Sequence, residues 1–144
     1  MKIMVCYDDS FVSKNVIKEA QKHAARWNAE IKVVSVVTRV EPIKHAKLVK
    51  MEERLEQEIQ ELFEGVETPY TVQLYVDDTE AGEKIVTIAE RNRVNLIFIG
   101  IKKRSKVGKL LFGSTVQYVI LKAPCPVVTL NAVSTDDLSR FPYA

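Results

Sequence analysis

Five short runs of β-branched and other apolar residues alternate along this chain with stretches in which apolar residues recur at helical spacing. This alternation limits the fold more than any other feature, because strands covered by helices on both faces are apolar throughout. We therefore predict an α/β domain with an open, mainly parallel five-stranded sheet, helices on both faces and right-handed crossovers. The expected strands are residues 2–7, 30–37, 70–76, 94–100 and 124–130.

The stretches between these runs predict four helices. Ser10 is a suitable N-cap for the first, whose apolar stripe extends from Val12 to Trp27 and should face the core. The second should be the longest and should end at Gly65. Thr79 is the expected N-cap of the third. The expected helices cover residues 12–27, 44–64, 80–89 and 113–121.

In open sheets of this kind, ligands bind beyond the carboxyl ends of the strands, where the direction of winding reverses. One loop at this edge, GIKKRSKVGKLLFGST (residues 100–115), is strongly basic, yet it lacks the Gly-Lys-Ser or Gly-Lys-Thr ending of a Walker loop. The first strand is followed by DDSF, and not by the Gly-x-Gly-x-x-Gly of a dinucleotide-binding loop. Neither standard phosphate loop is therefore present.

A different phosphate site is compatible with the last part of this loop. Gly113, Ser114 and Thr115 stand at the expected start of a helix, where free backbone N–H groups and the helix dipole favour an anion. Gly100, at the end of a strand, has no side chain to keep a phosphate away from the backbone. The residues alone leave three readings open: a nucleotide site, a patch for another polyanion, or a solvated surface loop.

This layout resembles the universal stress protein family over residues 1–130. The resemblance implies an adenine nucleotide alpha hydrolase-like sheet of strand order 3-2-1-4-5, and commonly a dimer. One branch of that family binds ATP through a glycine, two residues, a second glycine, nine residues, then glycine and serine. Gly100, Gly113 and Ser114 match this pattern, whereas Lys103 stands at the second glycine. The resemblance is carried by the loop quoted above, by VCYDDS (residues 5–10) and by APCPVV (residues 123–128).

The same resemblance implies residue roles and a ligand, which would be ATP or AMP, with Mg²⁺ as an optional companion. Asp8 would accept a hydrogen bond from the ribose, and the backbone of Val36 would meet the adenine. Lys103 and Arg104 would replace backbone donors with charged contacts to the phosphates. Nothing in the sequence specifies efficient turnover, so we expect weak ATP hydrolysis at most. The residues expected around the phosphates are Gly100, Gly113, Ser114 and Thr115.

Composition narrows the class of protein. With 144 residues, the chain should form one domain over residues 1–130 and a tail over residues 131–144. A net charge of +2 requires no polyanionic partner, and the basic loop lacks the interleaved aromatic residues that favour nucleic acid. We find no signal-peptide pattern and no run of roughly 20 apolar residues. We therefore expect a soluble cytoplasmic protein that does not enter a membrane.

Two functions remain as hypotheses. The first is a cytoplasmic stress-response module that binds an adenine nucleotide and acts as a sensor or regulator. The alternative is a nucleotide-free dimeric interaction protein whose basic loop, residues 102–109, docks an acidic partner. Both include a homodimer through the last strand, near Val127–Leu130, because a short apolar strand at a sheet edge must be covered.

Overall fold

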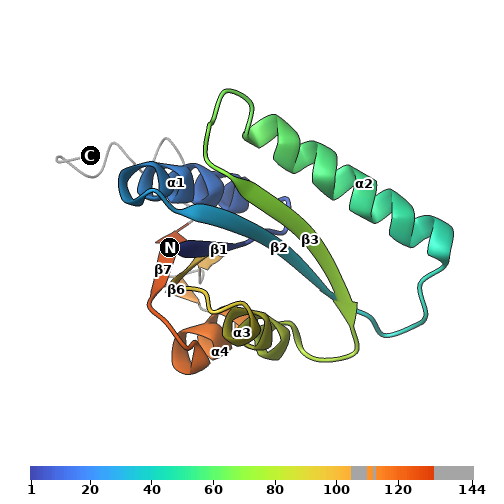
Figure 1. Ribbon diagram of the computed structural model, residues 1–144. Helices are drawn as coiled ribbons and strands as arrows, with labels where there is room; N and C mark the ends of the chain where they lie inside the picture. Colours follow the sequence, from blue (N-terminus) through green and yellow to red (C-terminus); the bar gives the residue numbers. More distant parts are fainter. Residues whose placement is uncertain (105–109, 112, 132–144) are drawn as a thin grey trace.

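The computed structural model describes residues 1–104, 110–111 and 113–131; of residues 103, 104, 110 and 111 it describes the backbone only. Strands and helices alternate along the chain (Figure 1). In chain order they are β1 (Lys2–Cys6), α1 (Phe11–Trp27), β2 (Glu30–Thr38), α2 (His45–Leu62), β3 (Tyr70–Asp77), α3 (Ala81–Arg91), β4 (Leu96–Ile101), β5 (Lys103–Arg104), β6 (Leu110–Leu111), α4 (Ser114–Lys122) and β7 (Val127–Asn131).

The main sheet has five strands in the order β3-β2-β1-β4-β7, and every neighbouring pair is parallel. The helices α1 and α2 cover one face, and α3 and α4 cover the other (Figure 1). The predicted fold class, including its strand order, is confirmed. The chain winds outward from β1 to β3 on one side and then from β4 to β7 on the other, so winding reverses between β1 and β4. This is the place where open α/β sheets bind ligands.

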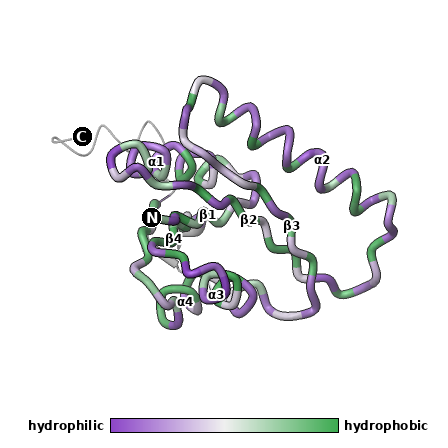
Figure 2. The backbone as a smooth tube through the Cα atoms, in the orientation of Figure 1, coloured by the Kyte–Doolittle hydropathy of each residue, from purple (hydrophilic) through white to green (hydrophobic). Residues whose placement is uncertain are grey.

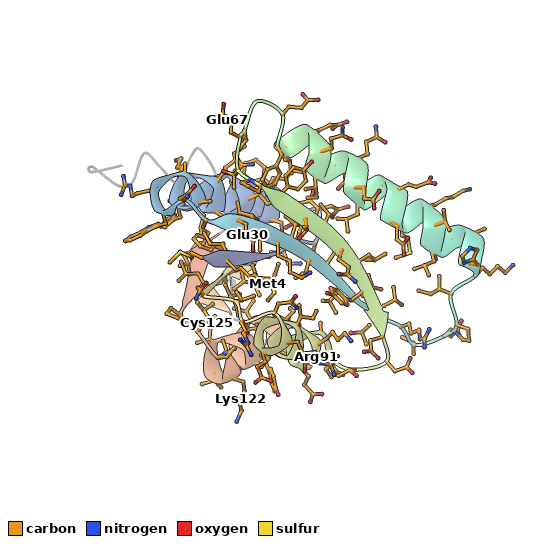
Figure 3. The ribbon with its side chains drawn as sticks, in the orientation of Figure 1. Met4, Glu30, Glu67, Arg91, Lys122 and Cys125 are labelled. Atoms are coloured by element: carbon orange, nitrogen blue, oxygen red, sulfur yellow. The ribbon has the colours of Figure 1, made fainter. Side chains whose placement is uncertain are left out.

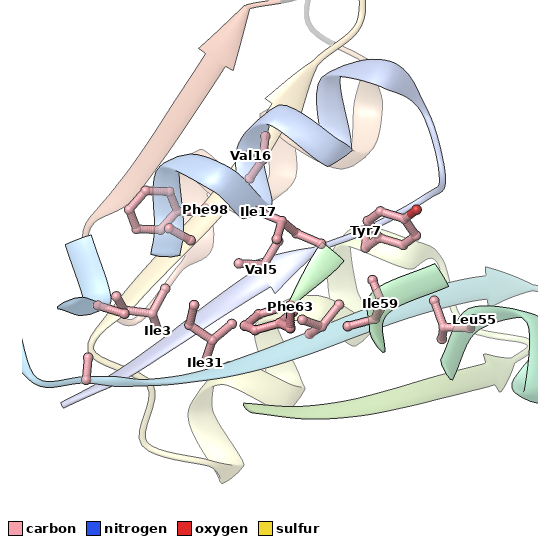
Figure 4. Close-up of a cluster of buried hydrophobic side chains, with 14 of the residues drawn as sticks. Ile3, Val5, Tyr7, Val16, Ile17, Ile31, Leu55, Ile59, Phe63 and Phe98 are labelled. Carbon is pink, nitrogen blue, oxygen red and sulfur yellow. The ribbon is translucent and has the colours of Figure 1, made fainter. Parts of the chain in front are cut away.

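Each face of the sheet has its own hydrophobic core. On β1, Ile3 and Val5 point toward α1 and α2, whereas Met4 points toward α3 and α4, as the alternation of a strand requires. Figure 4 shows the first core, in which Phe98 and Ile17 are fully buried. The interiors of the central strands β1 and β4 are apolar because both of their faces are covered.

The longest helix, α2, is amphipathic and packs through a narrow stripe. Only Leu55 and Ile59 are buried among its residues, and hydrophilic positions recur along it (Figure 2). It ends at Leu62, and Gly65 follows with φ +74°, a conformation that glycine adopts without strain. None of the helices in the described part of the chain is long and apolar enough to cross a membrane.

Two details of the predicted helices are wrong. Trp27 does not face the core, because α1 ends at this residue and the indole is 60% exposed. Thr79 is not the N-cap of α3; the cap is Glu80, whose side chain makes no capping hydrogen bond. The loop after Gly100 also holds an unpredicted element, since β5 and β6 form a small antiparallel pair. The expected tail lies outside the described residues from position 132 onward.

Candidate functional site

A cavity of ≈ 380 Å³ lies at the carboxyl ends of β1, β2 and β4. This volume falls within the range of about 300–1,000 Å³ that is usual for small-molecule sites. Its wall is apolar on the side of β2 and α3, where it includes Val34, Val36 and Ile85. The opposite side brings together the end of β1, the end of β4 and the start of α4. The polar residues that line it there are Asp8, Ser13, Lys102, Ser114 and Thr115.

Asp8 is fixed by a turn that its own side chain organises. Its Oδ1 accepts hydrogen bonds from the Ser13 hydroxyl at 2.6 Å and from the Ser10 backbone N–H at 3.2 Å. Ser10 in turn caps α1, because its hydroxyl accepts the Ser13 N–H at 3.2 Å. Between them, Asp9 has φ +61°, which aspartate tolerates better than most residues. The DDS sequence thus makes the sharp turn after β1 for which dinucleotide-binding loops use glycine.

The charge on Asp8 is balanced by Lys102, whose ammonium forms an ion pair with Oδ2. Burial alone would raise the pKa of Asp8, but hydrogen bonds from Lys102, Ser10 and Ser13 outweigh it and lower the pKa to about 2. Asp8 is therefore an ionised acceptor at neutral pH. Burial, together with the nearby Asp8 charge, raises the pKa of the Cys6 thiol to about 12, so Cys6 stays protonated and is a poor nucleophile.

Val36 contributes its backbone as well as its side chain. The carbonyl of Val34 accepts a hydrogen bond from the Tyr7 N–H at 2.8 Å, so the backbone groups of Val34 point toward β1. Backbone groups two residues apart in a strand point the same way, so those of Val36 share this direction. However, β1 ends at Cys6, which pairs with Val34. The N–H and C=O of Val36 therefore point into the space beyond the end of β1, where the cavity lies.

The start of α4 provides donors for an anion. The first backbone hydrogen bond of this helix runs from the Gln117 N–H to the Gly113 carbonyl at 3.0 Å. The N–H groups of Ser114 and Thr115 come before it and therefore have no acceptor within the helix. Gly113 is the N-cap and has no side chain to satisfy them. Apart from its chain neighbours, no described residue lies within 4 Å of the place where a Cβ of Gly113 would stand. The first residues of the helix line the cavity.

Gly100 lines the cavity, but the expected reason for a glycine here is wrong. A Cβ at this position would lie 2.9 Å from Cγ2 of Val12 and 3.3 Å from Cγ2 of Val16. The missing side chain therefore makes room for α1, which packs closely on β4, and not for a ligand. Gly100 still brings its backbone to the cavity wall.

The structure brings together most of the site residues predicted from the sequence. Lys103 and Arg104 belong to β5, but their side chains lie outside the described part, so their phosphate contacts remain predictions. Lys102 was not singled out, although it belongs to the same basic stretch. Among the described residues, no group of three or more His, Cys, Asp or Glu could hold a metal ion. The predicted residues that line the cavity are Asp8, Val36, Gly100, Gly113, Ser114 and Thr115.

Fold and site together define an α/β protein with a small-molecule cavity at the switch point of a parallel sheet. The sequence profile described as "Universal stress protein family" matches residues 1–131. The chain therefore belongs to the universal stress protein family.

Individual relatives agree with this assignment. A universal stress protein of Thermus aquaticus is 30% identical over 134 residues, which cover 90% of this chain and 97% of the relative. A solved universal stress protein of Archaeoglobus fulgidus is 30% identical with a TM-score of 0.76, and the match covers 90% of this chain and 97% of that one. A second structure from Archaeoglobus fulgidus, solved in complex with dAMP, is 25% identical with a TM-score of 0.72 over 90% and 96% of the two chains.

Proposed function

We propose that this protein binds an adenine nucleotide, ATP first and AMP second, and acts as a cytoplasmic sensor or regulatory module in the stress response. The observation that carries the proposal is a cavity that joins an apolar wall to an end lined by Lys102, Ser114 and Thr115 at the start of α4. A nucleotide matches both ends of this cavity, because its base is largely apolar and its phosphates are charged.

The apolar end suits a purine. The side chains of Val34, Val36 and Ile85 would pack against the faces of the ring, since flat apolar surfaces gain most from such burial. The backbone N–H and C=O of Val36 would meet the hydrogen-bonding edge of adenine, which has both a donor and acceptors. The ribose would then lie near Asp8, whose carboxylate accepts hydrogen bonds from hydroxyl groups.

The polar end suits phosphates. The N-terminus of α4 offers backbone N–H groups and the positive end of a helix dipole, and the hydroxyls of Ser114 and Thr115 add two donors. Lys102 brings a positive charge to the same cavity. We expect Lys103 and Arg104 to add charge at the outer phosphates, where Mg²⁺ would bind to the ligand itself. Among the described residues that line the cavity, the only carboxylate is Asp8, which is already bound by Ser10, Ser13 and Lys102, so we expect hydrolysis to be weak.

Relatives support the ligand class. The Archaeoglobus fulgidus protein that was solved with dAMP is similar over nine tenths of this chain. That similarity favours an adenine nucleotide over other anionic ligands of the same size. The alternative function, a nucleotide-free protein with a basic docking loop, leaves the cavity without a role.

Calorimetric titration of nucleotide-stripped protein with Mg-ATP and with AMP tests the proposal. We expect one ligand per chain, with about tenfold weaker affinity in Asp8→Asn, which removes a charged acceptor. Gly113→Val should weaken binding at least as much, because it would add a side chain where Gly113 lines the cavity at the start of α4. The control is Thr71→Val, on an exposed position of the edge strand β3. Absence of binding heat with both nucleotides would overturn the proposal in favour of the docking protein.

A further inference from the structure

The ion pair between Lys102 and Asp8 stands inside the proposed nucleotide site. The two oxygens of Asp8 have different roles. Oδ1 is occupied by Ser10 and Ser13, which hold the turn after β1, whereas Oδ2 is paired with Lys102. Only Oδ2 can therefore change partner without disturbing the turn.

Lys102 is placed to change partner as well. It follows β4, the neighbour of β1, and both ends meet at the cavity. Ser114 and Thr115, at the start of α4, line the same cavity. The lysine side chain is a flexible four-carbon stem with a terminal charge, and here it is 52% exposed. Because these residues line one cavity, we expect rotation about the side-chain bonds of Lys102 to turn the ammonium from Asp8 toward an anion at the start of α4.

The chemistry of the ligand decides whether this exchange is favourable. A neutral nucleoside that reaches Oδ2 with a hydroxyl displaces the ammonium and offers it no new partner. Separating this half-exposed ion pair without replacement gives up its attraction, because the ammonium then has only solvent as a partner beside the ligand. A nucleotide donates its hydroxyl to Oδ2 and gives the ammonium a phosphate, so both charges keep a partner.

We propose that Lys102 is an exchangeable counter-ion, paired with Asp8 when the site is empty and with the ligand's phosphate when it is filled, and that it thereby selects phosphorylated ligands. This inference rests on the proposed function. It adds a cause for selectivity: Lys102 disfavours adenosine by holding Asp8, and it favours nucleotides by binding phosphate.

The test compares AMP and adenosine, which differ by one phosphate, on wild-type protein and on Lys102→Met. Methionine keeps a flexible unbranched stem of nearly the same length and removes the charged ammonium. We expect wild-type protein to bind AMP at least about tenfold more tightly than adenosine. In Lys102→Met, AMP affinity should fall about tenfold, whereas adenosine affinity should rise several-fold, because Asp8 is no longer occupied. Lys102→Arg should restore the preference for AMP.

Lys122→Met is the matched control. Lys122, labelled in Figure 3, is the last residue of α4, whereas the first residues of this helix line the cavity, so its loss changes the net charge equally without touching the site. Both affinities should match those of the wild type in this variant.

The outcomes separate this inference from the function on which it rests. If the wild type binds neither ligand, the proposed function fails, and the inference fails with it. If the wild type binds AMP but Lys102→Met keeps the wild-type ratio of the two affinities, the inference alone is overturned. A parallel loss of both affinities would also overturn it, since Lys102 would then be structural.

Discussion

At the scale of single residues, Asp8 links folding to ligand binding. The carboxylate that would receive the ribose also closes the turn after β1 through Ser10 and Ser13. These hydrogen bonds stabilise the ionised form of Asp8 even in the absence of a ligand. The same interactions should be visible in the pH dependence of stability.

We predict that ionised Asp8 stabilises the fold and that this contribution disappears in acid. Its pKa is about 2 in the folded protein and 3.8 without the fold, so the stabilisation is complete above about pH 4 and is lost as the pH falls toward 2. Because the side chain is 42% exposed, solvent screening limits it to about 1 kcal/mol. Urea unfolding of wild type and Asp8→Asn between pH 2 and 6 measures it. A difference that stays constant across this range contradicts the prediction.

The sequence places a residue at the cavity where position in the fold decides this. Asp8 and Ser114 line the cavity as expected, because strand ends and helix starts can be recognised in the sequence, while their roles toward a ligand stay predictions. Lys102 could not be separated from Lys103 in the same way, since neighbouring lysines look alike until the direction of each side chain is known. The role of Gly100 was hidden for another reason: the atoms that require a glycine, those of Val12, belong to a distant part of the chain.

At the scale of secondary-structure elements, the spacing between α3 and α4 sets the shape of the cavity. Both helices contribute to its wall, α3 through Ala81 and Ile85 and α4 through its first residues. They approach closely at Gly82, where a Cβ would lie 2.9 Å from Cβ of Tyr118. Glycine at this position lets the two helices pack directly against each other.

We predict that Gly82→Ala destabilises the protein by about 1 kcal/mol, although alanine is the better helix former. The gain in helix propensity is about 0.5–1 kcal/mol, whereas forcing a methyl group into a filled contact costs roughly 1–3 kcal/mol. Tyr118 cannot yield easily, because the clash is with its Cβ and not with the end of its side chain. Thermal or urea unfolding measures the effect. Thr87→Ala, in the same helix, is the control and should raise stability by a few tenths of a kcal/mol.

Elements were predicted well in their interiors and less well at their ends. The apolar stripe of α1 is correct through Ala24, which is buried, but Trp27, the last residue of the helix, is exposed. Hydrophobic periodicity reports the direction of a side chain and not whether a partner surface reaches that far. Likewise, Thr79 suits an N-cap, but its carbonyl accepts the Thr38 hydroxyl and the helix starts one residue later than expected.

At the scale of the whole molecule, the two edges of the sheet differ in chemistry. The edge strand β3 presents the polar residues Thr71 and Gln73 to solvent. The other edge strand, β7, reads VVTLN, and its Val127, Val128 and Leu130 are only half-buried. Its backbone groups on the side away from β4 have no neighbouring strand within the described residues. An apolar edge of this kind tends to pair with another strand.

We therefore propose a homodimer in which β7 pairs with its copy in a second chain. Thr129 is an exposed residue in the middle of this strand, and a lysine there should weaken pairing, because charged edge residues oppose strand addition. Sedimentation at micromolar concentration should show a dimer for the wild type and a shift toward monomer for Thr129→Lys. Thr71→Lys makes the same change on the opposite edge and should leave the dimer intact. A wild-type protein that is strictly monomeric would exclude the interface, whereas equal effects of the two lysines would place the interface elsewhere.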